Sequence, residues 1–380
     1  MSRRAWLMLG LAGALAALLF REQIAPPDAA APDAVRSVLQ ERADNAGFAR
    51  VLGPRPLAFP RDHGAHPEFR HEWWYLTGHL HSEAGPWRGF QLTFFRYAPS
   101  PETSASHSRW RSNQWVVAHF AVSDPATGRF LHKARLSRVA LDLAGLGESD
   151  AKVWLGDWRL ERNSEDDTWH LSAATDEVAL QLRLTPSKPL VLQGDAGYSA
   201  KSAEPGNASH YYSLPRLAGA GELQVDGRSH PVAAQAWLDH EWGTSGLGQE
   251  QAGWDWFALQ LDDGRELTFY RLRRHDGTTD PHSRGLLVGR DGDAQPLVAE
   301  SVTMRPVREW TSPQSGIRYP VAWEVALPGP QLTFRLEPLF DAQEWAEGLR
   351  YWEGAVVVRT MRGGPAIGRG YLELTGYAAP

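Results

Sequence analysis

The sequence predicts an all-β protein built from two related units, and three kinds of observation lead to this fold class. Short runs rich in valine, threonine and aromatic residues recur along the chain, and such runs are typical of strands. Asp-Gly dipeptides, which favour tight hairpin turns, lie beside several of them. One pattern of residues also appears twice. Because no helical segments alternate with the runs, a sandwich or barrel of antiparallel strands is favoured over a parallel α/β sheet.

The clearest strand patterns occur in both halves of the chain. They cover Phe90–Tyr97, Trp115–Ser123, Val178–Leu184 and Leu267–Leu272. The hairpin dipeptides are Asp226-Gly227, Asp263-Gly264, Asp276-Gly277 and Asp291-Gly292. Ahead of all these segments, apolar residues at positions 35, 39 and 43 have helical spacing, which predicts one short N-terminal helix within residues 33–51.

The repeated pattern indicates two copies of one β unit. Trp74-Tyr75 is followed by Leu-Thr-Phe-Phe-Arg at residues 92–96, and Trp256-Phe257 is followed by Leu-Thr-Phe-Tyr-Arg at residues 267–271. The triplet His-Glu-Trp precedes each copy, and a glycine-rich stretch at residues 243–253 marks the junction. We therefore expect the helix and a lead-in over residues 34–68, a first domain over 69–243 and a second domain over 244–380.

The first 33 residues predict an export signal or an N-terminal anchor. Arg3 and Arg4 precede an apolar run over residues 5–20, which is shorter than the roughly 20 residues that a membrane-spanning helix needs. Alanines at residues 29–31 offer small side chains for cleavage. We expect the rest of the protein to be periplasmic or secreted, either released or held by an uncleaved N-terminal anchor.

Composition disfavours several classes of site and partner. With 39 Lys+Arg against 45 Asp+Glu the formal net charge is −6, which argues against a nucleic-acid partner. The absence of cysteine excludes disulfides, thiolate metal sites and cysteine nucleophiles. The chain also lacks the motifs of serine hydrolases, zincins, P-loops and dinucleotide sites. We expect no cofactor, no bound metal and, since nothing marks an interface, a monomer.

Five consecutive residues, His71, Glu72, Trp73, Trp74 and Tyr75, form the densest candidate site of the first half. Alternate side chains of a strand point to opposite faces, so Glu72 and Trp74 would share one face and the other three residues the second face. An ionisable group against aromatic walls loses hydration, which shifts its pKa towards neutrality and suits acid–base chemistry. The alternative is that the aromatic rings belong to the core while His71 or Glu72 faces solvent.

A second candidate site lies around the junction, where acids and one histidine are interleaved with aromatic residues. Its members are His240, Glu241, Trp242, Trp254, Asp255 and Trp256. Such groups would be costly to bury without a function, although a hydrogen-bonded network joining the two halves is the alternative. Tyr212 is a further candidate for ligand binding. Glu353 and Glu373 belong either to a pocket of the second unit or to its outer surface.

Five blocks resemble the lipocalin-like proteins grouped with bacterial AttH and the carotenoid 1,2-hydratases, a family often labelled as predicted secreted hydrolases. The blocks are HEWWYLTGHL, HYYSLPRL, AWLDHEWG, GWDWFALQLDDG and the terminal YWEG…GRGYLELTGY, from about residue 69 to the C-terminus. The resemblance implies two lipocalin-like antiparallel β-barrel domains packed together, with a hydrophobic cavity. It also implies that His240, Trp242 and the aromatic–Asp pair around Asp255 occupy positions that look catalytic in the hydratases.

Three functions are compatible with these residues. The first is a hydratase (a hydro-lyase), isomerase or hydrolase for an apolar or lipid-like substrate, with Asp255 or Glu241 as the acid and His240 as the base. Indoles such as those of Trp73 and Trp256 would then line its pocket. The second is a non-catalytic carrier that binds a hydrophobic small molecule or lipid and passes it to an envelope ABC-type transporter. The third is a structural or adhesion protein whose aromatic residues are only core.

Overall fold

The computed structural model describes residues 45–83, 85–101, 108, 110–244, 246–346 and 350–378. The predicted leader and residues 34–44 lie outside this part of the chain. The N-terminal helix was predicted within residues 33–51, of which the described residues 45–51 contain a turn, a bend and irregular backbone. Three one-turn 3-10 helices are present, η1 at Arg61–His63, η2 at Ala299–Ser301 and η3 at Met361–Gly363. Among the described residues, no helix is long and apolar enough to cross a membrane.

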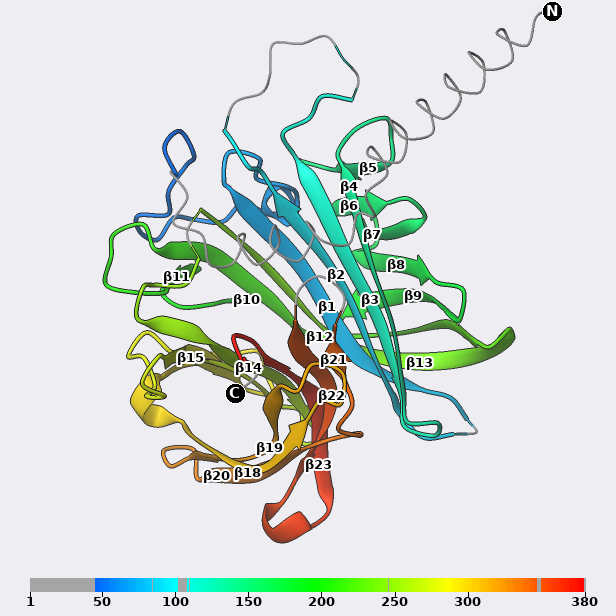
Figure 1. Cartoon of the computed structure of the whole chain (residues 1–380), viewed down its shortest axis with the longest axis vertical. Coiled ribbons are helices and arrows are strands. Elements are labelled where there is room, and N and C mark those ends of the chain that lie inside the picture. Colours follow the sequence, from blue (N-terminus) through cyan, green and yellow to red (C-terminus); the bar gives the residue numbers. More distant parts are fainter. Residues whose placement is uncertain are drawn as a thin grey trace, which may run out of the picture.

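The strands form two curled antiparallel sheets, which confirms the predicted fold class (Figure 1). The first sheet contains β1 (His71–His81), β2 (Arg88–Tyr97), β3 (Trp115–Asp124), β4 (Arg129–Arg138), β5 (Ala144–Leu146), β6 (Lys152–Leu155), β7 (Trp158–Asn163), β8 (Thr168–Ala174), β9 (Val178–Pro186), β10 (Val191–Leu192), β11 (Tyr198–Ala200), β12 (Ala208–Val225) and β13 (Arg228–Gly243).

The second sheet follows in the chain and forms the curled unit coloured from yellow-green to red in Figure 1. It contains β14 (Gln251–Leu261), β15 (Glu266–Arg274), β16 (Arg284–Val288), β17 (Ala294–Val298), β18 (Thr303–Thr311), β19 (Arg318–Leu327), β20 (Leu332–Pro338), β21 (Glu344–Trp345), β22 (Tyr351–Arg359) and β23 (Ala366–Leu374).

Both sheets share one strand order, as the repeated sequence pattern suggests. In the first sheet β4, β3, β2 and β1 are neighbours in that order, and β1 pairs with the last strand, β13. In the second sheet β17, β16, β15 and β14 are arranged in the same way, and β14 pairs with the last strand, β23. Asp226 and Gly227, which join β12 and β13, both have positive φ angles of 48° and 76°, a geometry that favours Asp-Gly in a tight hairpin.

The two His-Glu-Trp triplets, in contrast, are not equivalent parts of the repeat. The first opens β1, whereas the second lies near the end of β13, and these strands are antiparallel neighbours in the first sheet. Their register places Glu72 opposite Trp242 and Trp74 opposite His240. The pairing therefore brings Glu72 next to His240, which lies 168 positions further along the chain.

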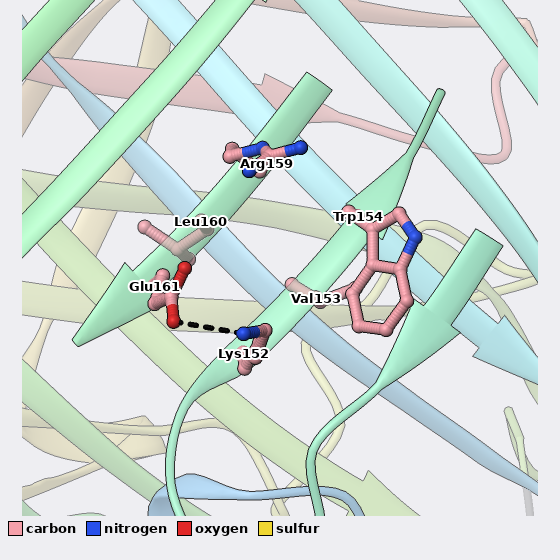
Figure 2. A pocket seen from close by; sticks show the side chains of 6 residues that line it. All are labelled: Lys152, Val153, Trp154, Arg159, Leu160 and Glu161. Carbon is pink, nitrogen blue, oxygen red and sulfur yellow. Dashed lines mark hydrogen bonds and ion pairs between the residues drawn. The ribbon is translucent and has the colours of Figure 1, made fainter. Parts of the chain in front are cut away.

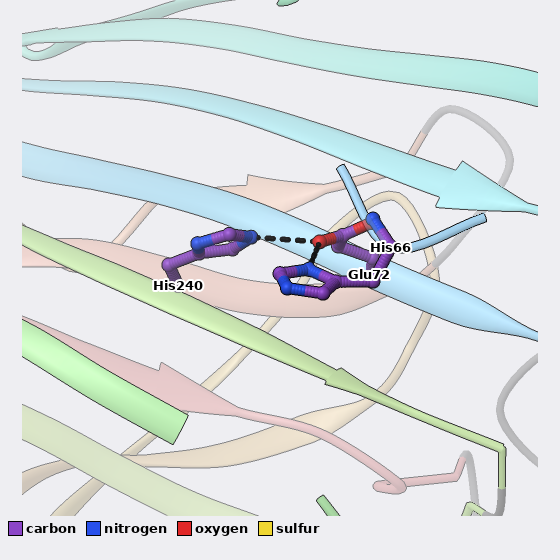
Figure 3. A group of neighbouring side chains, drawn as sticks. All are labelled: His66, Glu72 and His240. Carbon is purple, nitrogen blue, oxygen red and sulfur yellow. Dashed lines mark hydrogen bonds and ion pairs between the residues drawn. The ribbon is translucent and has the colours of Figure 1, made fainter. Parts of the chain in front are cut away.

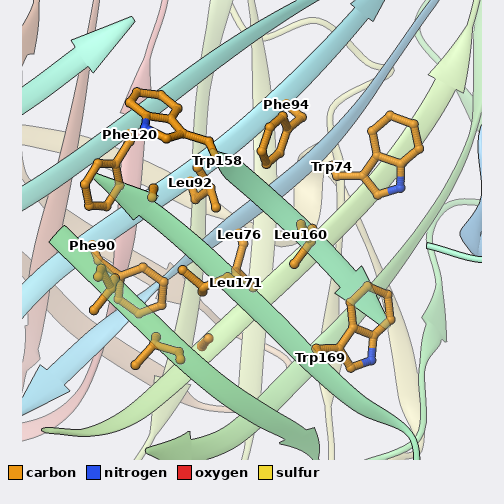
Figure 4. Close-up of a cluster of buried hydrophobic side chains, with 14 of the residues drawn as sticks. Trp74, Leu76, Phe90, Leu92, Phe94, Phe120, Trp158, Leu160, Trp169 and Leu171 are labelled. Carbon is orange, nitrogen blue, oxygen red and sulfur yellow. The ribbon is translucent and has the colours of Figure 1, made fainter. Parts of the chain in front are cut away.

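Each sheet encloses an apolar core of its own, and a third apolar layer lies between the sheets. Figure 4 shows part of the first core, which includes Trp74, Leu76, Phe94, Trp158 and Trp169. We call the layer between the sheets the inter-sheet layer; it consists of Tyr75, Tyr211, Trp237, Trp256, Ala258, Tyr270, Leu272, Ala355 and Tyr371. Because side chains alternate along a strand, the central strands contribute one face to a core and the other face to this layer.

Candidate functional site

Strand alternation divides the predicted site residues between different places. Glu72 and His240 lie with the predicted ligand-binding residues Trp74, Trp242 and Tyr212 on the core side of the first sheet. The neighbouring residues on the same strands point the other way, towards the second sheet. The faces predicted for residues 71–75 agree with the structure. The same alternation places His240 and Glu241 on opposite faces of β13, although they were expected to act together as base and acid.

Inside the first unit, Glu72 is the centre of a buried network with two histidines (Figure 3). Its Oε1 accepts hydrogen bonds from Nδ1 of His66 at 2.7 Å and from Nε2 of His240 at 2.8 Å. Its Oε2 accepts from Nε of Arg96 and from the backbone N–H of His66, both at 2.9 Å. All four lone-pair directions of this carboxylate thus have a donor.

The second ring nitrogen of each histidine has a partner of its own. Nε2 of His66 donates to Oδ1 of Asp62 at 3.0 Å, and Nδ1 of His240 lies 3.2 Å from the hydroxyl of Tyr212. The same hydroxyl lies 2.6 Å from Nδ1 of His63. Sequence reasoning missed Asp62, His63 and His66, because they lie in the lead-in and its one-turn helix, where no strand pattern points to them.

Stacking holds the histidine rings of this network in place, and nearby charges determine whether Glu72 is ionised. Trp242 stacks on His66 with ring centroids 3.9 Å apart, and Trp74 stacks on His240 at 4.7 Å. Burial opposes ionisation of Glu72, but the hydrogen bonds from both histidines and the charge of the nearby arginine outweigh it and hold its pKa well below the usual range. Burial lowers the pKa of His240. Glu72 is therefore a carboxylate at neutral pH and cannot serve there as a proton donor.

Asp239 and Glu241 face the inter-sheet layer from β13. Oδ2 of Asp239 accepts from the hydroxyl of Tyr211 at 2.9 Å, and its Oδ1 accepts from Nε1 of Trp237 at 2.7 Å. Glu241 forms an ion pair with Nζ of Lys201 at 2.8 Å. Burial raises the pKa of Asp239 to about 7, although hydrogen bonds from its neighbours oppose the shift. This side of the layer therefore holds one ion-paired acid and one weak acid.

Glu353 and Glu373 add two further acids from the second sheet. They lie opposite each other on β22 and β23. Tyr75 of the first sheet donates its hydroxyl to Oε1 of Glu353, and Nε1 of Trp254 donates to Oε1 of Glu373 at 3.0 Å. Oε2 of Glu353 is buried and has no hydrogen-bond partner among the described residues. The sequence left open whether these two glutamates lie inside the protein or on the outer surface of the second unit. The structure supports the inward location.

Loss of hydration raises the pKa of both glutamates, which favours their protonated forms at neutral pH. It raises the pKa of Glu373 to about 8, with the charges of Asp239 and Glu241 acting in the same direction and the hydrogen bond from Trp254 opposing them. It also raises the pKa of Glu353 well above the usual value, and the neighbouring glutamate adds to this shift. Two carboxylates directly opposite each other repel, so the second ionisation is harder still. The pair thus offers a neutral acid next to aromatic rings.

The inter-sheet layer approaches the surface at two tryptophans. Trp73 and Trp254 pack against it and are half-buried, whereas Trp256 is buried and packs edge-on against Tyr75 with centroids 5.1 Å apart. His71 stacks on Trp73 at 5.7 Å. Five predicted ligand-binding residues therefore meet at the inter-sheet layer. Three come from the first sheet and two from the second, namely His71, Trp73, Tyr75, Trp254 and Trp256.

Asp255 lies in a third place, on the face of β14 opposite to the neighbouring tryptophans. Its Oδ1 accepts from Nε of Arg273 at 3.1 Å and from the hydroxyl of Tyr377 at 2.8 Å, and its Oδ2 lies 3.4 Å from Nη1 of Arg271. Burial raises its pKa, against the effect of these partners. Within the described chain, no hydrogen bond or ion pair joins Asp255 to the other two predicted catalytic residues, so the catalytic role of each stays a prediction.

One surface pocket lies away from all of these groups, over β6 and β7 (Figure 2). Its volume is about 110 Å³, and it is lined by Lys152, Val153, Trp154, Arg159, Leu160 and Glu161. Nζ of Lys152 pairs with Glu161 at 3.0 Å across one wall. Ligand sites for drug-sized molecules usually measure roughly 300–1,000 Å³, so this small, partly ion-paired pocket is a weak candidate.

Comparisons with known proteins agree with the fold. Residues 50–377 match a family model described as AttH-like. The crystal structure of a candidate AttH protein from Nitrosomonas europaea is 39% identical, with a TM-score of 0.77, and the match covers 87% of this chain and 100% of that chain. Kievitone hydratase from Nectria haematococca shares the fold at 14% identity, with a TM-score of 0.63 over 87% of this chain and 98% of that chain. No curated protein matches the sequence.

Proposed function

Because the chain belongs to the AttH-like family, we propose that it is an acid–base enzyme that adds water to a carbon–carbon double bond of an apolar substrate. The reaction takes place at the inter-sheet layer. The observation that carries the proposal is the glutamate pair, buried Glu353 and half-buried Glu373, side by side on an aromatic surface. Hydration of an alkene needs a proton donor that is neutral, desolvated and close to rings that can face a developing cation.

Each step of the proposed reaction uses groups of this layer. The proton on Oε2 of Glu353 goes to one alkene carbon, and the π electron pair forms the new C–H bond. The cation left on the second carbon faces the rings of Tyr75 and Trp256. A water molecule forms the C–O bond to this carbon, and its surplus proton passes to the carboxylate of Glu353, which restores the acid. Neutral Glu373 next to it stabilises the transient carboxylate.

The protonation and hydrogen bonding of the acids favour this layer over the histidine network of the first unit. Glu72 is ionised there and all its acceptor positions are used. A carboxylate in that state neither protonates an alkene nor has a free position to orient water. Oε2 of Glu353 has no such partner among the described residues, so no hydrogen bond competes for its proton.

The apolar character of the substrate follows from the surroundings of the pair. Aromatic side chains from both sheets surround the acids, and the half-buried indoles of Trp73 and Trp254 lie at the edge where a substrate enters by displacing them. The fold shared with a protein named kievitone hydratase is consistent with a hydratase. We also propose that the protein works outside the cytoplasm, which the basic residues and apolar run at its N-terminus favour, and that it works as a monomer.

The experiment is native mass spectrometry of the purified protein, incubated in ¹⁸O-labelled water with the apolar lipid extract of the cells that produce it. The proposal predicts a captured molecule that is returned heavier by one labelled water. A captured molecule that stays unchanged would instead identify a carrier for a hydrophobic ligand. The absence of any captured molecule would favour a structural role for the aromatic layer.

A further inference from the structure

Three side chains of the first unit direct potential metal-binding atoms towards one point. Nδ1 of His66, Oε1 of Glu72 and Nε2 of His240 all lie within 4.8 Å of one another, and all three residues are buried (Figure 3). They come from three different parts of the fold, namely the lead-in, β1 and β13. Two imidazoles and one carboxylate form a donor set that is common in zinc and other transition-metal sites.

The surroundings of the histidines resemble the outer shell of a metal site. Metal-bound histidines almost always have their second ring nitrogen hydrogen-bonded to a carboxylate or another acceptor, which fixes the tautomer and ring orientation. Here Nε2 of His66 donates to Asp62 at 3.0 Å, and Nδ1 of His240 lies 3.2 Å from the hydroxyl of Tyr212. In both residues the inner nitrogen faces Glu72, and the proton that it donates to Glu72 without the ion is released when an ion binds.

The rings and the carboxylate are also held in place from outside. Trp242 stacks on His66 with an interplanar angle of 3°, and Trp74 stacks on His240 at 21°. Arg96 and the backbone N–H of His66 donate to Oε2 of Glu72, the oxygen that accepts no hydrogen bond from the imidazole rings. Ligands whose positions are fixed in this way lose little conformational entropy when they bind an ion.

We propose that His66, Glu72 and His240 bind one divalent transition-metal ion, with zinc as the best-fitting type. Nitrogen and oxygen donors with no sulfur suit zinc, which binds histidine at roughly 2.0–2.1 Å. Ligand atoms around a tetrahedral ion then lie about 3.3 Å apart. Oε1 of Glu72, which lies 2.7 and 2.8 Å from the two ring nitrogens without the ion, therefore moves away from them, and the nitrogens adjust around the ion. The proposal departs from the expectation of a metal-free protein.

The ion ties the lead-in to the seam where the first sheet closes. His66 precedes β1, while Glu72 and His240 lie on the neighbouring first and last strands of that sheet. A metal bound only by the folded arrangement of these elements stabilises the fold by its own binding energy. Its role is therefore structural and independent of the acids between the sheets.

The test is the metal content and thermal unfolding of the full-length protein. After removal of metal with a chelator, addition of Zn²⁺ is expected to restore one ion per chain and to raise the unfolding temperature. Tyr212→Phe removes the outer partner of His240, together with the contact to His63, and is expected to weaken zinc affinity roughly 10–100-fold. His282→Gln, which changes a histidine paired with Asp280 on the second unit, is the matched control and leaves affinity unchanged.

Two results would overturn the proposal. If chelated and zinc-treated protein have the same metal content and unfolding temperature, the network is held by hydrogen bonds alone. If His240→Gln still folds and binds zinc with full affinity, the ion lies elsewhere. Neither readout depends on catalysis, so failure here leaves the proposed hydratase activity untouched, and failure of that activity leaves the metal site untouched.

Discussion

Glu353 and Glu373 lie directly opposite each other on β22 and β23, against the layer between the two sheets, with Glu353 buried and Glu373 half-buried. Two acids in this relationship cannot both ionise at low cost, because each carboxylate is desolvated and repels the other. A protein selected only for stability gains nothing from such a pair. Its presence beside aromatic rings is the physical basis of the proposed proton transfer.

The first prediction concerns the pH dependence of stability. The folded protein binds the proton of Glu373 more tightly than the unfolded chain does, since burial raises the pKa from about 4.5 to about 8. The resulting stabilisation is complete below pH about 4.5 and is lost as the pH rises through about 8. The free energy of unfolding of the wild-type protein should therefore fall between pH 4.5 and 8. In Glu373→Gln this fall should be smaller than in the wild type, by a difference on the order of 3 kcal/mol. Denaturant unfolding across this range measures it, with Glu300→Gln on the exposed surface as the control.

The second prediction concerns the pH dependence of activity. The proposed mechanism needs a neutral pair, so kcat/KM should fall as the pH rises through the pKa of Glu373 at about 8. Ionised Glu373 would hold the proton on Glu353 more tightly and weaken it as a donor. The pH profile of labelled-water incorporation measures this. A rate that increases through pH 8 would mean that the pair acts as a base instead.

The third prediction compares two tyrosines of the inter-sheet layer. Tyr75 donates its hydroxyl to Glu353, whereas the buried hydroxyl of Tyr371 has no hydrogen-bond partner among the described residues. Tyr75→Phe should leave a buried acceptor unsatisfied and cost about 1–3 kcal/mol of stability. Tyr371→Phe, with the same change of atoms, should be nearly neutral. Chemical denaturation of both variants checks the difference, and equal costs would contradict the hydrogen-bond assignment.

The fourth prediction separates the structural and catalytic interpretations of Asp255. Its carboxylate is bound by Arg271 and Arg273 and lies apart from the inter-sheet acids. Asp255→Asn should therefore destabilise the protein, by about 2 kcal/mol or more because two partly buried arginines lose their counter-charge, and should leave turnover per folded molecule unchanged. Calorimetry and the hydration assay on one sample decide it. Loss of turnover at unchanged stability would restore Asp255 as the catalytic acid.

Much of the fold could be predicted from the sequence because strands leave local patterns. Alternation in residues 71–75 placed Glu72 and Trp74 on one face, and the recurring aromatic pairs marked the equivalent strands β1 and β14. The same alternation rule should have separated His240 from Glu241, which are adjacent in sequence but face opposite sides of β13. Grouping them by sequence proximity ignored a signal that was present.

The composition of the candidate sites could not be predicted, because it depends on which distant strands pair and in which register. Glu72 meets His240 only because the first sheet closes between its first and last strands. Glu353 meets Glu373 only because β22 and β23 pair without an offset at that point. His66 belongs to a lead-in without periodicity, so nothing local marks it as a partner of either.

The most direct test of the central claim is the rate at which the Glu353→Gln variant incorporates ¹⁸O-labelled water into the captured substrate. Glutamine keeps the shape of the side chain and removes only the transferable proton. A general acid of this kind contributes about 10²–10⁴-fold to the rate. A loss of this size is expected with ligand capture retained, while Glu300→Gln should incorporate water at the wild-type rate. Incorporation by Glu353→Gln at the wild-type rate would contradict that claim.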